Sequence, residues 1–325
     1  MHQPSDLQQR ISDALAGIDI PPEPGNLYDP IRYMLQIGGK RIRPLLTLMA
    51  ADLFSIASID QAVPAAVAVE LFHNFSLVHD DIMDGAPLRR GKQTVHERWD
   101  TNIAILSGDS LLVMAYAQLA RCEANSLPQI LNAFNRMASA VCEGQQLDMD
   151  FERRPDVSLD EYLHMITLKT SVLLGAALEM GAILSGASDA DIRLIYRFGV
   201  NVGLAFQLQD DLLDVYGNPE QFGKKPGGDI LANKKTYLLV KALGISDHAT
   251  RAELSGLFGD PQPEPEQKIA GVKGVYDRLG IQQLAEASKQ AYIDEAFKAL
   301  DNIGVPDARK VPLRILAQNL LHRQQ

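Results

Sequence analysis

The chain has little cysteine and few aromatic residues. Its 325 residues include two cysteines, Cys122 and Cys142, and one tryptophan, and aromatic residues make up 6% of the total. Two isolated cysteines exclude a disulfide framework and a cysteine-rich zinc site, so we expect buried free thiols within helices. Hydrophobic residues nevertheless reach 46%. High apolar content with so few aromatic side chains is typical of a helical protein with a large core.

Positive charge is also scarce. The chain carries 31 Lys and Arg against 41 Asp and Glu, which gives a formal net charge of -10. This excess of acid repels polyanions and argues against nucleic acid or an anionic membrane as a general partner. The N-terminal stretch from Met1 to Asp13 is polar and has no apolar core for export, and no long uncharged run follows. We therefore expect a cytoplasmic protein with no integral membrane segment.

Neither a linker nor a strand pattern interrupts the chain. Apolar residues recur at three- and four-residue spacing, and no alternating run lies between turn signals, so we expect one all-α domain over residues 1–325. Ser158 and Glu161 form a capping-box pattern at one helix start. Loops are expected at 85–91 and 222–229 and a hinge at 261–265. Helices are expected at 30–37, from about 44 to 54, and at 62–84, 102–123, 127–150, 158–185, 189–216 and 230–243, before two or three shorter ones.

One acidic signature occurs twice. Asp80-Asp81-Ile82-Met83-Asp84 and Asp210-Asp211-Leu212-Leu213-Asp214 each end a strongly apolar helical stretch. On a helix the first and last carboxylates lie four residues apart and share a face. Magnesium ions that bridge carboxylates to phosphate oxygens are the natural counter-charge. The pair therefore predicts a magnesium-diphosphate site.

The alternative is a solvated helix face, which explains many single acidic motifs. Aspartate is a poor helix former, and late in a helix it opposes the negative end of the helix dipole. A sequence that carries this arrangement twice, after apolar residues, favours bound cations. We interpret the weak internal repeat as two halves of one magnesium-diphosphate site, not as two separate sites.

Three basic clusters accompany the acidic motifs. They are Lys40-Arg41-Ile42-Arg43, Arg89-Arg90 and Lys224-Lys225, each beside glycine. Guanidinium and ammonium groups on a flexible backbone suit phosphate recognition. Each cluster alone is common on protein surfaces, but together with the acidic motifs they indicate diphosphate binding.

These strings together resemble one enzyme family. Residues 70–84, followed by Arg89-Arg90-Gly91, resemble the first aspartate-rich region of the trans-prenyl diphosphate synthases, and 206–214 resemble the second. Three further motifs occur in the same order, so that the similarity spans about residues 38–237. The resemblance implies an all-α isoprenoid synthase bundle with a central active-site cavity, commonly as a homodimer. The further motifs are Gly38-Gly39-Lys40-Arg41-Ile42-Arg43-Pro44, Lys169-Thr170, and Gly223-Lys224 with Asp229 and Lys234-Lys235-Thr236-Tyr237.

The resemblance also implies a role for each site residue. Asp80 and Asp84 would bind two magnesium ions and Asp210 a third, while Asp81, Asp211 and Asp214 would hold metal-bound waters or neighbouring contacts. Two groups of basic residues would each bind one diphosphate. The allylic diphosphate would be held by Arg89, Lys169, Lys224 and Lys234, and that of isopentenyl diphosphate by Lys40, Arg43, His73 and Arg90.

The expected reaction follows from charge. Magnesium and the basic groups stabilise the diphosphate as the allylic carbon–oxygen bond ionises. Oxygens of Thr170 and Gln207 would stabilise the carbocation, the isopentenyl double bond would attack it, and the released diphosphate would accept the proton. His79 is an alternative base, but a packed or hydrogen-bonded histidine is the favoured interpretation.

Product length is read from the helix before the first motif. Ser76 and Phe75 lie four and five residues before Asp80; the small serine leaves room and the phenylalanine forms a floor. By resemblance this pattern favours geranylgeranyl diphosphate, with farnesyl diphosphate as the alternative. A floor elsewhere, at Phe72, Val113 or Met114, stays open.

Three other functions compete with this interpretation. A di-iron oxidoreductase would use the Glu-x-x-His pairs Glu70/His73 and Glu161/His164, but it leaves the doubled acidic motif and the basic loops unexplained. A class I terpene cyclase would normally replace the second acidic motif and lack the isopentenyl-binding residues. A non-catalytic partner subunit would have eroded motifs.

Overall fold

A computed structural model describes residues 2–217, 227–259 and 263–321, and it is all-α as expected. The chain forms two compact units. Four helices cross from one unit to the other along the chain, so this division does not decide the prediction of a single domain. Unit 1 comprises 1–136, 176–196 and 303–313, and unit 2 comprises 137–175, 197–302 and 314–325.

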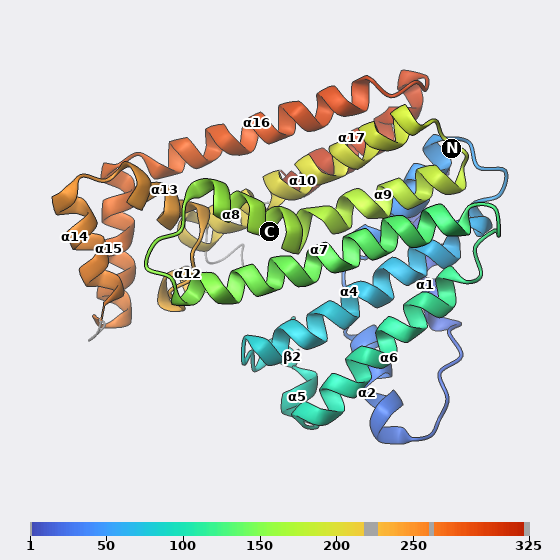
Figure 1. Cartoon of the computed structure of the whole chain (residues 1–325), viewed down its shortest axis with the longest axis horizontal. Helices are drawn as coiled ribbons and strands as arrows, with labels where there is room; N and C mark the ends of the chain where they lie inside the picture. The colour runs from blue at the N-terminus through green and yellow to red at the C-terminus, as the bar shows by residue number, and fades with distance from the viewer. Residues whose placement is uncertain (1, 218–226, 260–262, 322–325) are drawn as a thin grey trace. The chain divides into compact units, whose positions relative to one another are not determined.

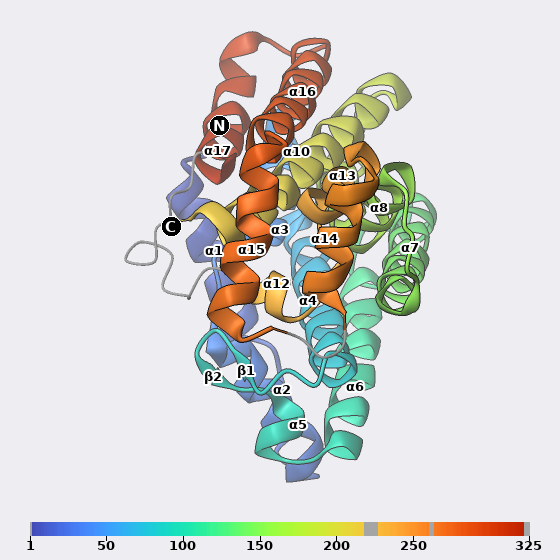
Figure 2. The same cartoon turned by 90° about the vertical axis from the view of Figure 1, so that its left-hand side faces the viewer.

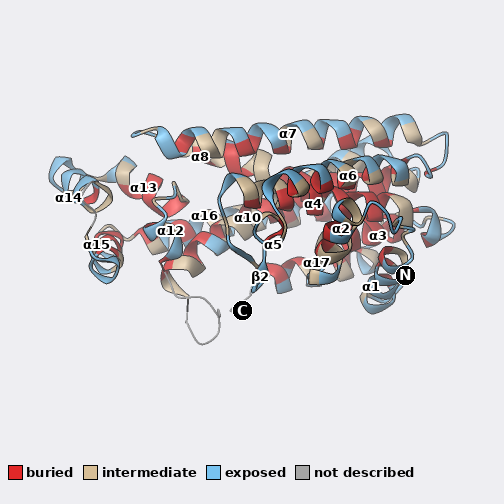
Figure 3. Cartoon of the chain, turned by 90° about the horizontal axis from the view of Figure 1, so that it is seen from below, coloured by how far each residue is buried: buried red, intermediate tan, exposed pale blue. Residues whose placement is uncertain are grey.

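Unit 1 holds the first acidic motif at the end of a long central helix. This helix, α4, runs beside α6 (Figure 1) and is buried along most of its length (Figure 3). The elements of this unit, in chain order, are α1 (Pro4–Ala16), α2 (Gly25–Ile37), α3 (Ile42–Leu53), η1 (Ile59–Gln61), α4 (Val63–Met83), β1 (Leu88–Arg89), β2 (Lys92–Gln93), α5 (Val95–Arg98) and α6 (Thr101–Leu119).

Unit 2 holds the second acidic motif at the end of α10. A separate apolar core joins α8, α10, α13, α15 and α16, and α15 packs beside α14 and α12 (Figure 2). Wholly within this unit lie α8 (Leu159–Ile166), the π-helical turn η2 (Thr167–Ser171), α12 (Gly228–Leu231), α13 (Tyr237–Ile245), α14 (His248–Phe258), α15 (Pro265–Arg278) and α16 (Ile281–Asp301). The helices that cross between units are α7 (Leu127–Arg153), α9 (Val172–Leu184), α10 (Asp189–Tyr216) and α17 (Asp307–Leu321).

Several expected boundaries are correct and others are wrong. The capping box is confirmed, because Ser158 and Glu161 exchange side-chain and backbone hydrogen bonds. The helix expected to open at Pro30 begins at Gly25, since a proline one turn into a helix removes only one backbone hydrogen bond. Among the described residues three helices follow the expected hinge, the number predicted, but they are not short, since α16 has 21 residues. The helix α14, which precedes the hinge, was not expected.

Two expected helices are interrupted. The segment 158–185 contains a π-helical turn between α8 and α9. The segment 230–243 divides into α12 and α13, because Asn233 adopts a left-handed conformation and Thr236 caps a new helix. A two-residue β-ribbon, β1–β2, occupies the expected basic loop. The predicted loop at 222–229 and hinge at 261–265 lie partly outside the described residues.

The cysteine prediction is half right. Cys122 is buried and free, and burial raises the pKa of its thiol to about 11. Cys142 lies on α7 but is exposed, because it falls on the outer face of that helix. Cys122 follows α6 in a turn, since α6 ends at Leu119 rather than near 123.

Within the described residues, two helical stretches are long and apolar enough to be considered as membrane spans. In Leu159–Leu184 the apolar window is 78% buried inside the protein, as in a core helix of a soluble protein. In α6 it is only 33% buried. Length and composition alone are weak signs of a span, but the exposed apolar face of α6 needs an explanation.

Candidate active site

The first acidic motif ends α4 with one carboxylate turned inward. Asp81 is 1% exposed, and its Oδ1 accepts hydrogen bonds from Arg89 Nε at 2.9 Å and Nη2 at 2.5 Å. Its Oδ2 is buried and has no hydrogen-bond partner among the residues that the structure describes. Burial raises the pKa of Asp81, and the Arg89 guanidinium opposes part of this rise. Asp84, at the helix end, is exposed.

The second acidic motif ends α10 with a more enclosed middle carboxylate. Asp211 is 3% exposed; its Oδ2 accepts bonds from the Tyr162 hydroxyl at 2.6 Å and the Tyr237 backbone N–H at 2.8 Å. Its Oδ1 accepts a bond from Gln207 Nε2 at 3.2 Å. Burial raises the pKa of Asp211 to about 7 despite these donors. Asp210 is exposed.

The last residue of the second motif binds the chain that follows. Asp214 Oδ2 accepts a hydrogen bond from the Asp229 backbone N–H at 3.1 Å, and its carbonyl oxygen accepts one from Gly227. Asp214 therefore anchors the start of α12. In both motifs, protein donors hold the middle carboxylate inside, whereas Asp84 and Asp210 face solvent.

These oxygen donors fit magnesium. Magnesium keeps several waters and is bound by one or two carboxylates together with substrate phosphates. The exposed carboxylates of Asp84 and Asp210 meet this need. The buried Oδ2 of Asp81, which has no hydrogen-bond partner among the described residues, is a further acceptor for a metal-bound water. Across the described part of the chain, no group of three or more His, Cys, Asp or Glu side chains is gathered as a ready-made metal cage.

The Glu-x-x-His pairs of the di-iron alternative serve other purposes. Glu70 is bound to Arg41, and Glu161 closes the capping box and pairs with Arg154 at 2.8 Å. His164 is exposed on α8. Both glutamates that a di-iron centre would need as ligands are therefore already bound to other residues of the protein.

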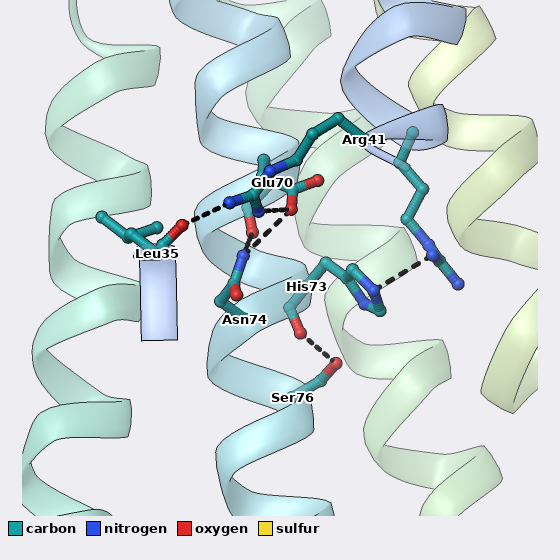
Figure 4. A network of polar contacts seen from close by, with 7 residues as sticks. Leu35, Arg41, Glu70, His73, Asn74 and Ser76 are labelled. Carbon is teal, nitrogen blue, oxygen red and sulfur yellow. Dashed lines mark hydrogen bonds and ion pairs between the residues drawn. The ribbon is translucent and has the colours of Figure 1, made fainter. Parts of the chain in front are cut away.

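In unit 1, Arg41 forms a buried ion pair with Glu70 (Figure 4). Arg41 has a left-handed backbone at φ 48° and binds both the Glu70 carboxylate and the Leu35 carbonyl, the latter at 2.6 Å. Asn74, one turn further along α4, donates to Glu70 Oε1 at 3.1 Å. Arg41 is thereby turned into the protein, whereas its neighbour Lys40 is exposed. Sequence analysis assigned Arg41 no role, because its partner is 29 residues away.

His73 and Arg43 contact each other directly. Arg43 Nη1 lies 3.1 Å from His73 Nε2. Burial lowers the pKa of His73 well below its usual value, and the positive charge of Arg43 lowers it further, so the imidazole is neutral at pH 7. Nε2 then accepts the Arg43 hydrogen and Nδ1 carries the proton. Burial also lowers the pKa of Arg43, to about 10, so it stays cationic.

Arg90 joins this group through a glycine. A side chain on Gly39 would lie 2.7 Å from the Arg90 guanidinium carbon, and Gly39 has φ +145°. This φ favours glycine, and the absence of a side chain at residue 39 leaves room for the Arg90 guanidinium. The structure therefore brings three of the four expected isopentenyl diphosphate residues, Arg43, His73 and Arg90, around one segment; Lys40 is exposed beside them.

In unit 2, Lys169 and Thr170 lie on the π-helical turn. Such turns often mark functional sites, because they displace side chains from the regular helical register. Lys169 Nζ pairs with Asp148 Oδ2 at 2.5 Å, and Thr170 Oγ1 lies 3.5 Å from Gln207 Oε1. The structure thus brings Thr170 and Gln207 together, as their expected shared role requires.

Two glycines allow the π-helical turn to pack closely against neighbouring helices. A side chain on Gly144 of α7 would lie 2.7 Å from the Lys169 Cα, and one on Gly203 of α10 would lie 2.7 Å from the Ser171 Cα. Both contacts are with backbone, which cannot move aside cheaply. Sequence analysis missed these glycines; a glycine inside a long helix was the available signal.

The remaining allylic residues are less defined. Lys224 lies outside the described residues. Lys234 is exposed, with its Nζ 4.0 Å from Asp229 Oδ1. The allylic set expected from the sequence is therefore divided, with Arg89 in unit 1 and Lys169 and Lys234 in unit 2. That the two acidic motifs serve one site stays a prediction.

Aromatic side chains line the α4 face before the first motif. Phe75 is buried and lies 5.5 Å from Phe72 between ring centroids; Phe72 lies 5.4 Å from Phe134. Ser76, next to Phe75, donates to the His73 carbonyl at 3.0 Å. Of the alternative floor residues, Phe72 belongs to this cluster, whereas Val113 is 67% exposed.

Comparison with known proteins identifies the family of the chain. A profile of the polyprenyl synthetase family matches residues 24–275. A geranylgeranyl diphosphate synthase of Methanosarcina mazei is 36% identical over 301 residues, covering 91% of this chain and 90% of the relative. A (2E,6E)-farnesyl diphosphate synthase of Mycobacterium bovis is 36% identical over 288 residues, covering 88% and 80%.

A solved structure gives the same answer for the fold. A crystal structure of a geranylgeranyl pyrophosphate synthase superimposes with a TM-score of 0.94, at 44% identity and with 100% of both chains covered. The predictions of an all-α fold and of a prenyltransferase are confirmed. The chain belongs to the polyprenyl synthetase family, as the resemblance of its motifs implied.

Proposed function

We propose that the protein condenses isopentenyl diphosphate with an allylic diphosphate and that its main product is geranylgeranyl diphosphate. The carrying observation is the shared design of the acidic motifs, in which protein donors hold Asp81 and Asp211 inside while Asp84 and Asp210 face solvent. This design suits metal ions that also bind a substrate phosphate. The relatives named for geranylgeranyl diphosphate support the same product.

Asp80, Asp84 and Asp210 are proposed as direct magnesium ligands, with three ions per site. Asp81, Asp211 and Asp214 are proposed as the residues that fix each motif and hold metal-bound water. Bound magnesium would neutralise the charge that develops on the leaving diphosphate. The chain's own carboxylates set where this neutralisation occurs, because each is anchored at the end of a buried helix.

The basic residues divide between two diphosphates. Arg43, His73, Arg90 and Lys40 are proposed to hold the isopentenyl diphosphate: two guanidinium groups and a neutral imidazole that donates from Nδ1 match its oxygens. Arg89, Lys169, Lys224 and Lys234 are proposed to hold the allylic diphosphate. The ion pairs of Arg89 with Asp81 and of Lys169 with Asp148 orient these cations before substrate binds.

The carbocation formed on ionisation needs oxygen atoms that do not attack it. Thr170 Oγ1 and Gln207 Oε1 are proposed for this role, since both are weak nucleophiles and lie together beside the π-helical turn. Gln207 is oriented by donating to Asp211. The proton released on condensation is proposed to pass to the departing diphosphate.

Phe75 is proposed as the floor that ends chain growth, with Ser76 leaving room above it. The aromatic cluster of Phe72, Phe75 and Phe134 supports this floor, because it packs a rigid wall one turn before the acidic motif. A farnesyl product, as named for the Mycobacterium relative, would place the floor nearer the motif.

A homodimer through α6 is the proposed assembly, in the cytoplasm. The apolar face of α6 carries four exposed side chains at helical spacing, an arrangement that marks contact surfaces. A second copy would cover this face, and Val113→Asp should then yield monomer in analytical ultracentrifugation. The four side chains are Ile105, Leu106, Val113 and Tyr116.

Product analysis tests the proposed reaction. The protein is incubated with magnesium, isopentenyl diphosphate and dimethylallyl, geranyl or farnesyl diphosphate, and the products are dephosphorylated and sized. Geranylgeranyl product is expected, and Phe75→Ala should lengthen it. A predominantly farnesyl product in the wild type would contradict the proposed floor but not the condensation.

A further inference from the structure

His79 occupies a position between α4 and α6 that no catalytic role explains. It precedes Asp80 on α4, yet its Nε2 lies 3.2 Å from the Ile105 carbonyl oxygen of α6. The same nitrogen lies 3.7 Å from Asp109 Oδ1. The imidazole is therefore packed and hydrogen-bonded across the two helices, as sequence analysis favoured over a general base.

The space for this imidazole exists because residue 108 is glycine. A side chain on Gly108 would overlap the His79 ring, with the His79 Cδ2 only 2.5 Å from the added carbon. Gly108 is buried within α6, where an alanine would favour the helix by about 1 kcal/mol. The missing methyl group forms a notch into which His79 fits.

The His79 ring also contacts the Phe75 ring. The two ring centroids lie 4.7 Å apart with an interplanar angle of 63°, an edge-on contact. Phe75 and His79 are one helical turn apart on α4, so their side chains project to the same face. Phe75 is thus held between His79 on one side and Phe72 on the other.

We propose that His79, seated in the Gly108 notch, is a positioning residue that fixes the Phe75 ring and thereby sets the length of the prenyl product. The inference rests on the proposed role of Phe75 as the floor. With His79 fixed by Ile105 and Gly108, the Phe75 ring cannot turn toward α6. If His79 moves, Phe75 can turn into the vacated space and a longer chain can pass.

Product length in four variants tests this role. We expect His79→Ala and Gly108→Ala each to raise the share of products longer than geranylgeranyl several-fold, in the same direction as Phe75→Ala. If Gly108 acts through His79, adding Gly108→Ala to His79→Ala should change the distribution no further. Products are sized after incubation with magnesium, isopentenyl diphosphate and farnesyl diphosphate.

A matched glycine controls for a general effect on helices. Gly244 of α13 has nothing within 4 Å of an added side chain, so Gly244→Ala should leave the product length unchanged. An unchanged product in His79→Ala, with a longer one in Phe75→Ala, would overturn this inference and keep the floor. An unchanged product in Phe75→Ala would overturn both. If Gly108→Ala does not fold, His79→Ala still decides.

Discussion

The two acidic motifs share a sequence pattern but hold their middle carboxylates differently. Asp81 is held by Arg89, a cation that is also proposed to bind substrate, and it keeps one oxygen without a partner. Asp211 is held by three donors, from Tyr162, Tyr237 and Gln207. The first motif can therefore respond to a bound diphosphate through Arg89, whereas the second is a fixed anchor. The two motifs therefore have the same sequence pattern but different roles in the proposed site.

The largest expected effect comes from the exposed carboxylates, one in each motif. Asp84→Asn and Asp210→Asn should each lower kcat about 100- to 1000-fold, because each removes a carboxylate that is proposed to hold magnesium against the leaving diphosphate. Neither should lower the melting temperature, since both residues are exposed. Steady-state kinetics and thermal unfolding measure these effects, with exposed Asp6→Asn as the control. Equal loss of stability and activity would contradict the metal-ligand assignment.

The pH dependence of stability should report the burial of the middle carboxylate of the second motif. Burial raises the pKa of Asp211 from 3.8 to about 7, so between these values the folded state binds more protons than the unfolded state. The contribution of Asp211 to stability is then fully present below about pH 4 and is lost as the pH rises to about 7. Relative to Asp211→Asn, the wild type should lose on the order of 1 kcal/mol per pH unit in this window. Denaturant unfolding in magnesium-free buffer measures the free energy of unfolding of both proteins. A wild type that gains stability relative to Asp211→Asn as the pH rises would contradict the raised pKa of Asp211.

Removing one donor should show how firmly the second motif is anchored. Tyr162→Phe takes the hydroxyl from Asp211 Oδ2 and should lower the free energy of unfolding by about 1–3 kcal/mol. Tyr216→Phe is the matched control, because its hydroxyl binds Asp277 at 3.1 Å in a less buried place and should change stability by less than about 0.5 kcal/mol. Equal losses in the free energy of unfolding for Tyr162→Phe and Tyr216→Phe would contradict the view that Asp211 is a fixed anchor.

The smallest effect concerns Glu161, whose pKa is shifted in the opposite direction to that of Asp211. Backbone and side-chain hydrogen bonds from Ser158 lower the pKa of Glu161 from 4.5 to about 2. Its stabilising contribution is present above about pH 4.5 and is lost as the pH falls toward 2. The stability difference between the wild type and Glu161→Gln should therefore shrink on acidification. A difference that is constant from pH 7 to 2 would show that the capping box does not depend on charge.

The local features were predictable from the sequence. The capping box and the ends of α4 and α10 follow from short patterns, because their partners lie within one or two turns. The acidic motifs and the family also followed from contiguous strings. These signals need no knowledge of what packs against them.

The remaining features depend on distant partners. The Arg41–Glu70 pair joins residues 29 positions apart, and the π-helical turn between α8 and α9 is fitted against Gly144 and Gly203. No local pattern marks either one. The break between α12 and α13 also escaped, since a left-handed Asn233 is one of several conformations that its sequence allows.

Elongation itself tests the central claim most directly. The wild-type protein is incubated with labelled isopentenyl diphosphate and farnesyl diphosphate, with and without magnesium, and the labelled products are sized. We predict labelled geranylgeranyl diphosphate that forms only when magnesium is present. No elongated product with magnesium, from farnesyl diphosphate or from either shorter allylic partner, would contradict the account.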